Sequence, residues 1–374
     1  MYIFLLIFSK IKKWISYFCK KQFKMSSFYK LQIKEVKRET KSAVSVVFNV
    51  PSDLQNNFQF VAGQYLNLKL TLDGNEIRRS YSICSSPKSN ELRIAIKAVK
   101  NGLFSKFANE NLNVGDFLDV AAPEGKFTFE PKFDNQKNYA GFVAGSGITP
   151  VLSIIQDVLQ NEPKSTFVLV YGNKTIEETI FYTQLNALQQ EFLGRFFVHY
   201  VFSQENVNGE QFGRIEKPIV NLVLNNKHKE KEFDKFYLCG PEAMITTVSD
   251  VLKENNVAEK NIKFELFSTS KTENIAAASH EGHTKISVLV DGDEATFEMN
   301  QKQTILEASL KQGIDAPYSC QGGICSSCLA RVTKGTAEMR KNSILTDSEI
   351  AEGLILTCQA HPTSAEIFVD FDDV

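Results

Sequence analysis

Four cysteines place the strongest constraint on how this chain can fold. The segment YSCQGGICSSC, residues 318–328, holds three of the seven cysteines of the chain, at Cys320, Cys325 and Cys328. Their spacing is C-x4-C-x2-C, and Cys358 follows later, in ILTCQAHP. Glycine and serine fill the space between these thiols. The pattern predicts a tight loop that wraps closely around a group held by the sulfur atoms.

This is the plant-type ligand spacing for a [2Fe–2S] cluster, in which four thiolates hold two irons. Gly322 and Gly323 allow the positive φ angles and close backbone approach that such a loop needs. A zinc ribbon is the main alternative, but it would show two C-x-x-C pairs, and Cys358 stands alone. A thioredoxin-like C-x-x-C would need neither Cys320 nor Cys358. We therefore expect the four cysteines to be metal ligands.

The length and charge of the chain narrow its class. A chain of 374 residues is expected to form two or three domains. The net charge of −2 gives no basic footprint of the kind that nucleic-acid-binding proteins carry, so we expect no nucleic-acid partner.

Residues 1–24 differ in texture from the rest of the chain. The apolar run Tyr2–Phe8 is far shorter than the roughly 20 residues of a membrane-spanning helix. Its lysines follow the apolar run, whereas a secretory signal places its charge first. We expect Met25 to be the true start, with a basic interfacial anchor as the alternative. The expected compartment is the cytoplasm, without membrane contact.

The remaining sequence predicts a multidomain protein. Residues 25–132 contain short alternating or apolar runs broken by turns, which indicates an all-β barrel or sandwich. Residues 133–267 alternate apolar strands with helical stretches, which predicts an α/β domain with a parallel sheet. The polar stretch 268–284 is expected to be a linker. Residues 285–374 begin with a hairpin signal around an Asp-Gly turn and contain the cysteines.

Each of the first two domains carries motifs that resemble the ferredoxin-NADP reductase superfamily. Arg79, Tyr81 and Ser82 in RRSYS look like its R-x-Y-S flavin motif. Arg79 could neutralise the flavin pyrophosphate, Tyr81 could lie flat on the isoalloxazine ring, and Ser82 could hydrogen-bond near its N5. Gly102 and Ser105 in GLFSKF offer a helix N-terminus for the pyrophosphate. The resemblance implies an FAD barrel and adds Lys97, Val99 and Phe104 to the flavin contacts.

A second motif, VAGSGITP, joins an apolar strand to a helix at residues 143–150. Its glycines let the backbone approach a phosphate, although the third glycine of a Rossmann G-x-G-x-x-G is absent. In this context it resembles the dinucleotide loop of the superfamily. YGNKT and YLCGPEAM match later parts of the same site. The implied NAD(P)H contacts are Gly145, Ser146, Gly147, Ile148, Thr149, Pro150, Tyr171, Gly172, Asn173, Lys174, Cys239, Gly240, Pro241, Glu242 and Met244, with Phe267 near the flavin.

Four of these residues are expected to lie at the reacting rings: Tyr81, Ser82, Thr149 and Cys239. Cys239 is interpreted as a packing residue without covalent chemistry of its own. Lys174 stands where a cation could meet a 2′-phosphate, and its short turn contains no acidic residue for a ribose diol. That favours NADPH over NADH as the co-substrate.

The segment YSCQGGICSSCLARVTKGTAEM with LILTCQAHP resembles the plant-type, β-grasp-like ferredoxin domain fused to oxygenase reductases, closest to those of phenylacetyl-CoA epoxidase. The resemblance implies an oxidoreductase that passes electrons from NAD(P)H through FAD and a [2Fe–2S] cluster to a di-iron oxygenase. The alternatives are the same electron-transfer chain serving a Rieske hydroxylase, a desaturase or a stress-response protein, and a non-enzymatic structural zinc protein.

Overall fold

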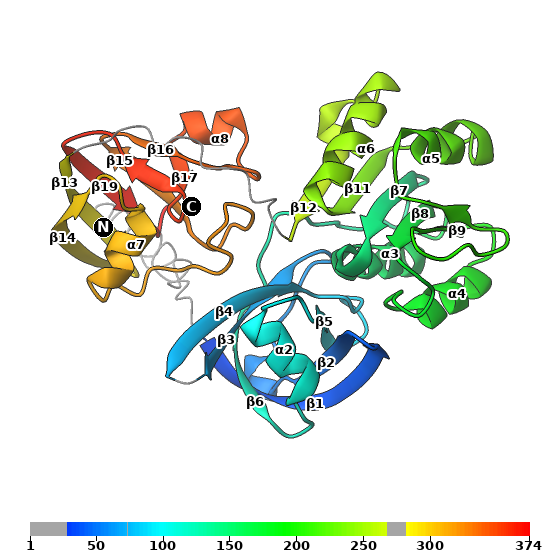
Figure 1. Ribbon diagram of the computed structural model, residues 1–374, viewed down its shortest axis with the longest axis horizontal. Coiled ribbons are helices and arrows are strands. Elements are labelled where there is room, and N and C mark those ends of the chain that lie inside the picture. Colours follow the sequence, from blue (N-terminus) through cyan, green and yellow to red (C-terminus); the bar gives the residue numbers. More distant parts are fainter. Residues whose placement is uncertain (1–27, 73, 268–281) are drawn as a thin grey trace, which may run out of the picture.

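The computed structural model describes residues 28–72, 74–267 and 282–374. Figure 1 shows three modules arranged around a common centre: a barrel, an α/β module and a C-terminal module. The predicted extension 1–24 and most of the predicted linker lie outside the described residues. His283 and Thr284, which we assigned to the linker, instead belong to the first strand of the C-terminal module. Within the described residues, no helix is long and apolar enough to cross a bilayer.

The N-terminal module is the predicted all-β barrel. Its six strands follow the order β4-β3-β6-β1-β2-β5, and every pair is antiparallel. A bridge between Ile83 and Ile94 joins the two ends of this order and closes the barrel. Alternate side chains point inwards to one apolar core. The elements are β1 (Phe28–Thr40), β2 (Ala43–Asn49), η1 (Ser52–Leu54), β3 (Tyr65–Leu72), β4 (Asn75–Ser82), β5 (Leu92–Lys97), α2 (Leu103–Glu110) and β6 (Phe117–Ala121).

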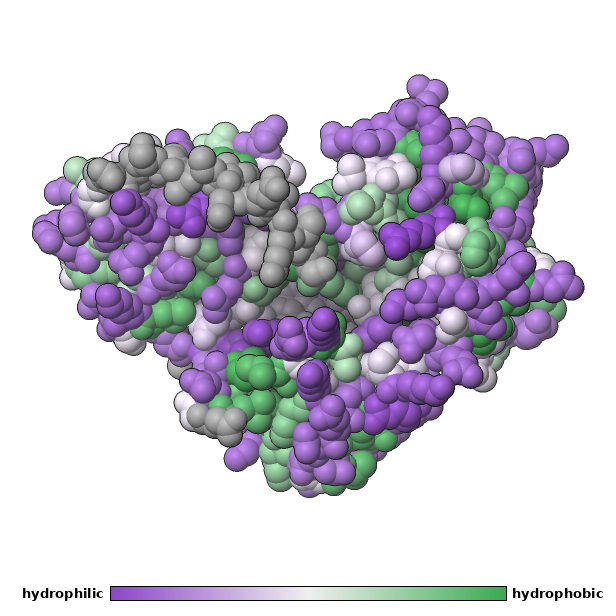
Figure 2. Space-filling view, viewed as in Figure 1, coloured by the Kyte–Doolittle hydropathy of each residue, from purple (hydrophilic) through white to green (hydrophobic). Residues whose placement is uncertain are grey.

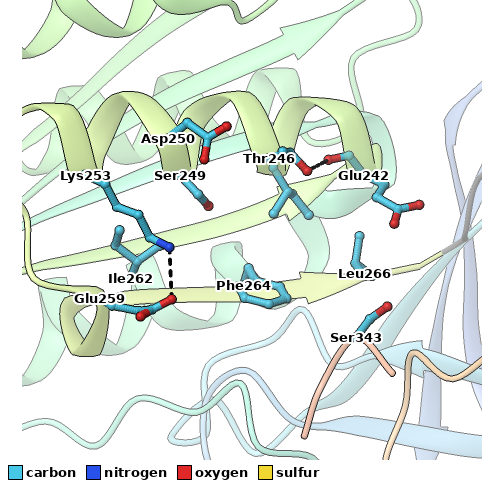
Figure 3. A pocket seen from close by; sticks show the side chains of 11 residues that line it. Glu242, Thr246, Ser249, Asp250, Lys253, Glu259, Ile262, Phe264, Leu266 and Ser343 are labelled. Carbon is cyan, nitrogen blue, oxygen red and sulfur yellow. Dashed lines mark hydrogen bonds and ion pairs between the residues drawn. The ribbon is translucent and has the colours of Figure 1, made fainter. Parts of the chain in front are cut away.

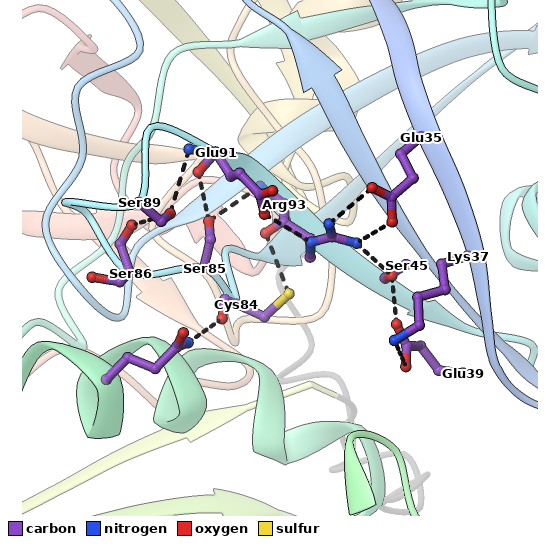
Figure 4. Close-up of polar contacts among 11 residues, drawn as sticks. Glu35, Lys37, Glu39, Ser45, Cys84, Ser85, Ser86, Ser89, Glu91 and Arg93 are labelled. Atoms are coloured by element: carbon purple, nitrogen blue, oxygen red, sulfur yellow. Dashed lines mark hydrogen bonds and ion pairs between the residues drawn. The ribbon is translucent and has the colours of Figure 1, made fainter. Parts of the chain in front are cut away.

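A partly buried polar group also lies in the barrel (Figure 4). Arg93 donates to both carboxylate oxygens of Glu35, at 3.0 and 3.3 Å, and to the hydroxyl of Ser45. Cys84 is 2% exposed and its thiol donates to the backbone oxygen of Arg93. Burial raises the pKa of Cys84. This cysteine is therefore a structural residue of the barrel.

The second module is the predicted parallel sheet with βαβ crossovers. Its order is β10-β9-β8-β7-β11-β12, and every pair is parallel. The strands at its centre are almost wholly buried, as parallel strands covered on both faces must be. The elements are β7 (Asn138–Ala144), η2 (Gly145–Gly147), α3 (Ile148–Asn161), β8 (Thr166–Asn173), α4 (Tyr182–Glu191), β9 (Phe196–Phe202), β10 (Gln211–Phe212), α5 (Lys217–Asn221), the π-helical turn η3 (Leu222–Lys227), β11 (Lys235–Gly240), α6 (Glu242–Glu254), η4 (Glu259–Asn261) and β12 (Ile262–Leu266).

The C-terminal module is a mixed sheet with two short helices. Its strand order is β14-β13-β19-β15-β17, and the central pair β13–β19 is parallel. The predicted hairpin turns at Asp291 and Gly292, which both have positive φ. Thr304 caps the predicted helix in a capping box with Glu307. The elements are β13 (His283–Val290), β14 (Asp293–Asn300), α7 (Ile305–Lys311), β15 (Leu329–Lys334), β16 (Ala337–Met339), α8 (Asp347–Ala351), β17 (Leu354–Leu356), β18 (Ala360–Pro362) and β19 (Glu366–Asp370).

The outer surface and the meeting point of the modules differ in character. Figure 2 shows a largely hydrophilic surface on each module, with a recess between the C-terminal module and the α/β module. Each module has at least one apolar core of its own. Ile324, at the tip of the cysteine loop, is 8% exposed and packs with the apolar cluster of the α/β module. The cysteine loop therefore reaches the α/β module, and residues 341–349 also contact both neighbours through the ion pairs Lys341–Glu242 and Lys126–Glu349.

Candidate functional site

One cavity of about 800 Å³ lies where the three modules meet. This volume is within the usual range for a site that holds a cofactor-sized ligand. The barrel, the loop after β7, the end of β12 and the cysteine loop all contribute to its wall. The lining residues are Tyr65, Arg79, Ser80, Tyr81, Ser82, Ala95, Lys97, Val99, Gly102, Phe104, Ser105, Ser146, Thr149, Glu265, Leu266, Phe267, Ser319, Cys320, Gln321, Gly322, Ile324 and Cys325.

The predicted flavin residues of the barrel share this cavity. Arg79, Tyr81 and Ser82 follow one another along β4 and its edge of the cavity. The ring of Tyr81 lies 5.5 Å from that of Phe104, so the two rings form a joint apolar wall. Burial raises the pKa of Tyr81, which keeps its hydroxyl neutral. A cation, a flat aromatic wall and a hydroxyl along one strand fit the pyrophosphate and ring of a flavin.

Ser82 is oriented by a carboxyl group from the α/β module. Its hydroxyl donates to Glu265 at 3.2 Å. Glu265 lies on β12 and is half-buried in the cavity wall. Burial raises the pKa of Glu265 to about 8, although the bond from Ser82 partly opposes the shift. The carboxyl is therefore mostly protonated at neutral pH, and it brings no full negative charge to the place where a hydride would arrive.

The start of α2 is built as the motif GLFSKF predicts. Gly102 is its N-cap and lies next to Ser105, whose hydroxyl accepts a hydrogen bond from the backbone N–H of Val99 at 3.2 Å. Ser105 therefore shapes the turn as well as the cavity wall. Lys97 forms a 3.7 Å ion pair with Glu178 of the α/β module. This pair links the flavin side of the cavity to the nucleotide side.

The loop after β7 forms the short turn η2, and α3 begins directly after it. Gly145 has a φ of +56°, which favours glycine. A Cβ atom on Gly147 would lie 2.2 Å from the backbone oxygen of Cys239, so Gly147 allows the turn to pack against β11. Thr149 donates to the carbonyl of Ser146 at 3.0 Å and closes the first helical turn. Ser146 and Thr149 line the same cavity as the flavin motif.

The other predicted nucleotide contacts lie at the ends of neighbouring parallel strands. Tyr171 is fully buried and donates to the carbonyl of Gly145 at 2.9 Å, which holds the phosphate loop in place. The side-chain Nδ2 of Asn173 is buried and has no hydrogen-bond partner in the part of the chain described. Lys174 follows it and is exposed. An unpaired donor beside an exposed cation, at the carboxyl edge of a parallel sheet, fits a dinucleotide.

The predicted residues after β11 are spread over different environments. Cys239 is fully buried, and burial raises the pKa of its thiol well above the usual range. That suits the predicted packing role, because a thiol held in its neutral form is a poor nucleophile. Met244 packs over Gly240. Glu242 does not line the flavin cavity; it lies in a second, smaller pocket between α6 and β12 (Figure 3), which adjoins the flavin cavity at Leu266. Ile148 and Pro150 are buried in α3, Gly172 lies within the last residues of β8, and Pro241 follows the end of β11.

The four predicted metal ligands come together in the structure. Hydrogen bonds link the thiol of Cys320 to those of Cys325 and Cys358, and the thiol of Cys328 to that of Cys358. These contacts lower the pKa of Cys320 and Cys328 and raise the pKa of Cys325 and Cys358, because the four thiols lie close enough to share protons. Within the described residues no three ligating side chains converge on a single-ion site. A two-iron cluster does not need a single-ion site, because its four thiolate ligands are divided between two irons.

The loop around these thiols has the expected wrapping geometry, with one shift in position. Gln321 and Gly323 have positive φ angles, and Gly322 does not. The backbone N–H of Gly322 donates to the sulfur of Cys320 at 3.3 Å. The residues fit a cluster, and the chemistry of four converging thiols with backbone N–H donors is the basis of that fit.

Sequence reasoning missed several residues of the cavity wall. Tyr65 begins β3, and its hydroxyl contacts Ser326 at 3.1 Å, in another module. Ser80 contacts Ser319 of the cysteine loop at 2.7 Å. Small hydroxyl residues between motif positions give no signal of their own. The presence of serine beside cluster cysteines was the only available indication.

Comparison with known proteins agrees with this reading of the chain. Three family models match: an oxidoreductase FAD-binding domain over residues 30–129, an oxidoreductase NAD-binding domain over 142–250, and a 2Fe-2S iron-sulfur cluster binding domain over 288–363. These ranges lie within the predicted domains 25–132, 133–267 and 285–374.

Two curated relatives cover almost the whole chain. One of the subunits of 1,2-phenylacetyl-CoA epoxidase from Escherichia coli is 37% identical over 93% of this chain and 99% of its own. The ferredoxin reductase component of 3-ketosteroid-9-alpha-monooxygenase from Rhodococcus rhodochrous is 31% identical, over 91% and 96%. The solved structure of phthalate dioxygenase reductase matches with a TM-score of 0.57 at 24% identity, over 92% of this chain and 98% of that one, which supports the same fold.

The family matches and the geometry of the cavity lead to the same conclusion. The modules match by sequence, and the cavity brings their predicted residues together. The chain binds FAD, NAD(P)H and a [2Fe–2S] cluster, and the alternative of a structural zinc protein is not supported. It belongs to the family of oxygenase reductases, the NAD(P)H-dependent flavin and iron–sulfur oxidoreductases that supply electrons to an oxygenase partner.

Proposed function

We propose that this chain is the reductase of a phenylacetyl-CoA epoxidase type of oxygenase, that its partner is a multisubunit di-iron protein, and that NADPH is its electron source. One observation carries the electron route. Cys320 and Cys325 line the same cavity as Arg79, Tyr81 and Thr149. The cluster loop, the flavin motif and the nucleotide loop therefore meet without an intervening layer of protein.

When bound, FAD accepts two electrons as a hydride from the nicotinamide and releases them one at a time to the cluster. The chain itself contributes positioning and charge. Arg79 provides a cation for the pyrophosphate, and Tyr81 with Phe104 provides an apolar wall. Ser82 is held by the largely neutral carboxyl of Glu265. Ser146 and Thr149 place the nucleotide loop across the cavity from this pair.

The choice of partner is supported by likeness to the epoxidase protein over nearly the full length of both chains. NADPH is supported by the exposed Lys174 beside the unpaired Nδ2 of Asn173. We also place the protein in the cytoplasm. The six described cysteines are all free, and four of them form the cluster site, which suits a reducing compartment.

Reconstitution with purified oxygenases tests this proposal. The holoprotein is mixed with the oxygenase subunits of a phenylacetyl-CoA epoxidase, and product formation is measured against NADPH and NADH consumption. We expect coupled turnover with the epoxidase subunits and a lower KM for NADPH. Rapid nucleotide oxidation without product would refute the partner, and a lower KM for NADH would refute the nucleotide preference.

A second acceptor has its own support. The 31% identity to the reductase component of a 3-ketosteroid monooxygenase also extends over most of both chains. The same reconstitution should therefore include a 3-ketosteroid-type oxygenase. Coupled turnover with that protein alone would favour this second candidate over the first.

A further inference from the structure

Arg78 stands next to the flavin motif and has no assigned role. It is only 6% exposed. Arg79 lines the flavin cavity, and Arg78 precedes it on β4, where successive side chains point to opposite faces. The side chain of Arg78 accordingly reaches the C-terminal module. Its Nη2 donates to Asp315 at 3.0 Å, while its Nε donates to Glu76 of the barrel at 2.7 Å.

Two aromatic rings enclose the same guanidinium. Its carbon lies 5.1 Å from the ring centre of Phe28 and 4.7 Å from that of Tyr318. Phe28 belongs to the barrel, and Tyr318 lies two residues before the ligand Cys320. A buried guanidinium is costly unless it is paired and hydrogen-bonded. Arg78 meets that requirement with one carboxylate and one ring from each module.

A second cation of the barrel, Lys69, lies close to Arg78. The carboxylate of Asp315 in the ferredoxin module is therefore more important for balancing the charge. Lys69 of β3 stands directly opposite Arg78 of β4 in the strand register. Its Nζ lies 4.6 Å from the same ring of Phe28. Like charges directly opposite each other destabilise a strand pair. Glu76 contacts both cations, at 3.9 Å and 2.7 Å, and can neutralise only one of them. Asp315 supplies the second negative charge, from the ferredoxin module.

The other contacts between the barrel and the cysteine loop include a bond from Ser327 to the carboxylate of Glu124 at 2.9 Å and several bonds between hydroxyl groups. Tyr65 contacts Ser326 and Ser327 at 3.1 and 3.2 Å, and Ser80 contacts Ser319 at 2.7 Å. Such neutral hydrogen bonds contribute less than those to charged groups. Among the described residues, Arg78 is the barrel side chain that forms an ion pair with the segment leading into the cluster loop.

We propose that Arg78 is a positioning residue for the flavin-to-cluster step, holding the ferredoxin module by Asp315 and Tyr318 so that the cluster loop closes the flavin cavity. The inference rests on the proposed electron route. Arginine suits the task because its planar guanidinium can bridge two carboxylates and stack on two rings at once, which a lysine ammonium cannot do.

Anaerobic stopped-flow experiments on the FAD- and cluster-loaded protein separate the two electron-transfer steps. NADPH is mixed with wild type, Arg78→Gln and Asp315→Asn, and flavin reduction and cluster reduction are followed by their own absorbance changes. We expect unchanged flavin reduction. Cluster reduction should slow about tenfold in Arg78→Gln. The loss of one hydrogen bond between charged groups lowers by about that factor the fraction of molecules in which the ferredoxin module is docked. Asp315→Asn should act in the same direction by a smaller factor, because its side chain is 76% exposed.

Matched controls carry the same charge changes elsewhere. Lys334→Gln removes an exposed cation of β15, and Asp293→Asn removes an exposed carboxylate of β14. Neither should change either step. Salt gives a readout that a purely structural role would not move: cluster reduction in wild type should slow as ionic strength rises, and Asp315→Asn should lose part of that dependence.

The outcomes are distinguishable. If both interface variants reduce the cluster at the wild-type rate, the role of Arg78 is overturned. If NADPH does not reduce the flavin in the wild-type protein or in either variant, the proposed function is overturned. If Arg78→Gln does not fold or retain FAD, Asp315→Asn and its salt profile decide the matter. Small-angle scattering should also show a larger maximum dimension for Arg78→Gln, and an unchanged dimension would count against the proposal.

Discussion

Gly147 offers a sharp test of the nucleotide loop. A Cβ atom at this position would lie 2.2 Å from the backbone oxygen and 2.6 Å from the carbonyl carbon of Cys239. Its φ of −60° is acceptable to alanine, so the whole cost of Gly147→Ala is steric. The obstructing atoms belong to the backbone of β11, which cannot rotate away as a side chain can. Either η2 or the end of β11 must move.

The size of the movement sets the expected effect. Ordinary contacts of a Cβ atom begin at about 3.4 Å, so the turn must shift by about 1 Å. A misplacement of that size costs about a hundredfold in catalytic efficiency when it affects a positioned reactant. We expect kcat/KM for NADPH to fall by about a hundredfold in Gly147→Ala, which corresponds to about 2.7 kcal/mol. Overpacking should also lower stability by about 1–3 kcal/mol.

The assay uses ferricyanide as an artificial acceptor, so that the cluster and the oxygenase do not limit the rate. FAD content is measured in parallel and should stay at the wild-type level, because the flavin motif lies in the barrel. Gly194→Ala is the matched control. Gly194 belongs to the same module and has a φ of +77°, but a Cβ atom there would meet open space. It should lose about 1 kcal/mol of stability and keep its kcat/KM. A wild-type kcat/KM in Gly147→Ala would refute the argument.

Three further predictions follow from single residues. Cys358→Ser should lose iron and sulfide, measured chemically, while ferricyanide reduction persists; wild-type iron content would contradict the assignment. Glu265→Gln should change the pH dependence of stability. The folded carboxyl titrates near pH 8 and the free one near 4.5, so protons are released on unfolding and wild-type stability falls as pH rises between these values. Thermal midpoints at about pH 5 and about pH 9 should therefore differ less in the variant, and an unchanged difference would refute the shift. Lys174→Gln should raise the KM for NADPH about fivefold and leave that for NADH unchanged; equal changes in both would refute a phosphate contact.

The sequence predicted those features that depend on neighbouring residues. The hairpin followed from its Asp-Gly turn, whose residues both adopt positive φ. The strand β11 and the helix α6 followed from an apolar run and its periodic successor. The four thiols followed from their spacing. In each case the signal and the structure lie within a few residues, or within a motif whose chemistry demands convergence.

Contacts between distant segments were beyond such reasoning. The glycines of VAGSGITP were expected to face phosphate, but Gly147 is also required by Cys239 of β11, which is far along the chain. Arg78 and Asp315 are 237 residues apart, and neither lies in a recognised motif. The bond between Ser82 and Glu265 joins residues 183 apart. Only the tertiary structure pairs these groups.

The pair Arg78–Arg79 shows how one strand can serve two cofactors. Successive side chains of β4 point to opposite faces, so one guanidinium lines the flavin cavity while its neighbour holds the ferredoxin module. Both are fixed to the same hairpin, because β4 pairs with β3 along its whole length. The flavin contact and the ferredoxin contact are therefore fixed to one hydrogen-bonded strand. Replacing Arg79 should weaken FAD binding and leave the Arg78–Asp315 contact in place, whereas replacing Arg78 should uncouple the two cofactors and leave each one bound.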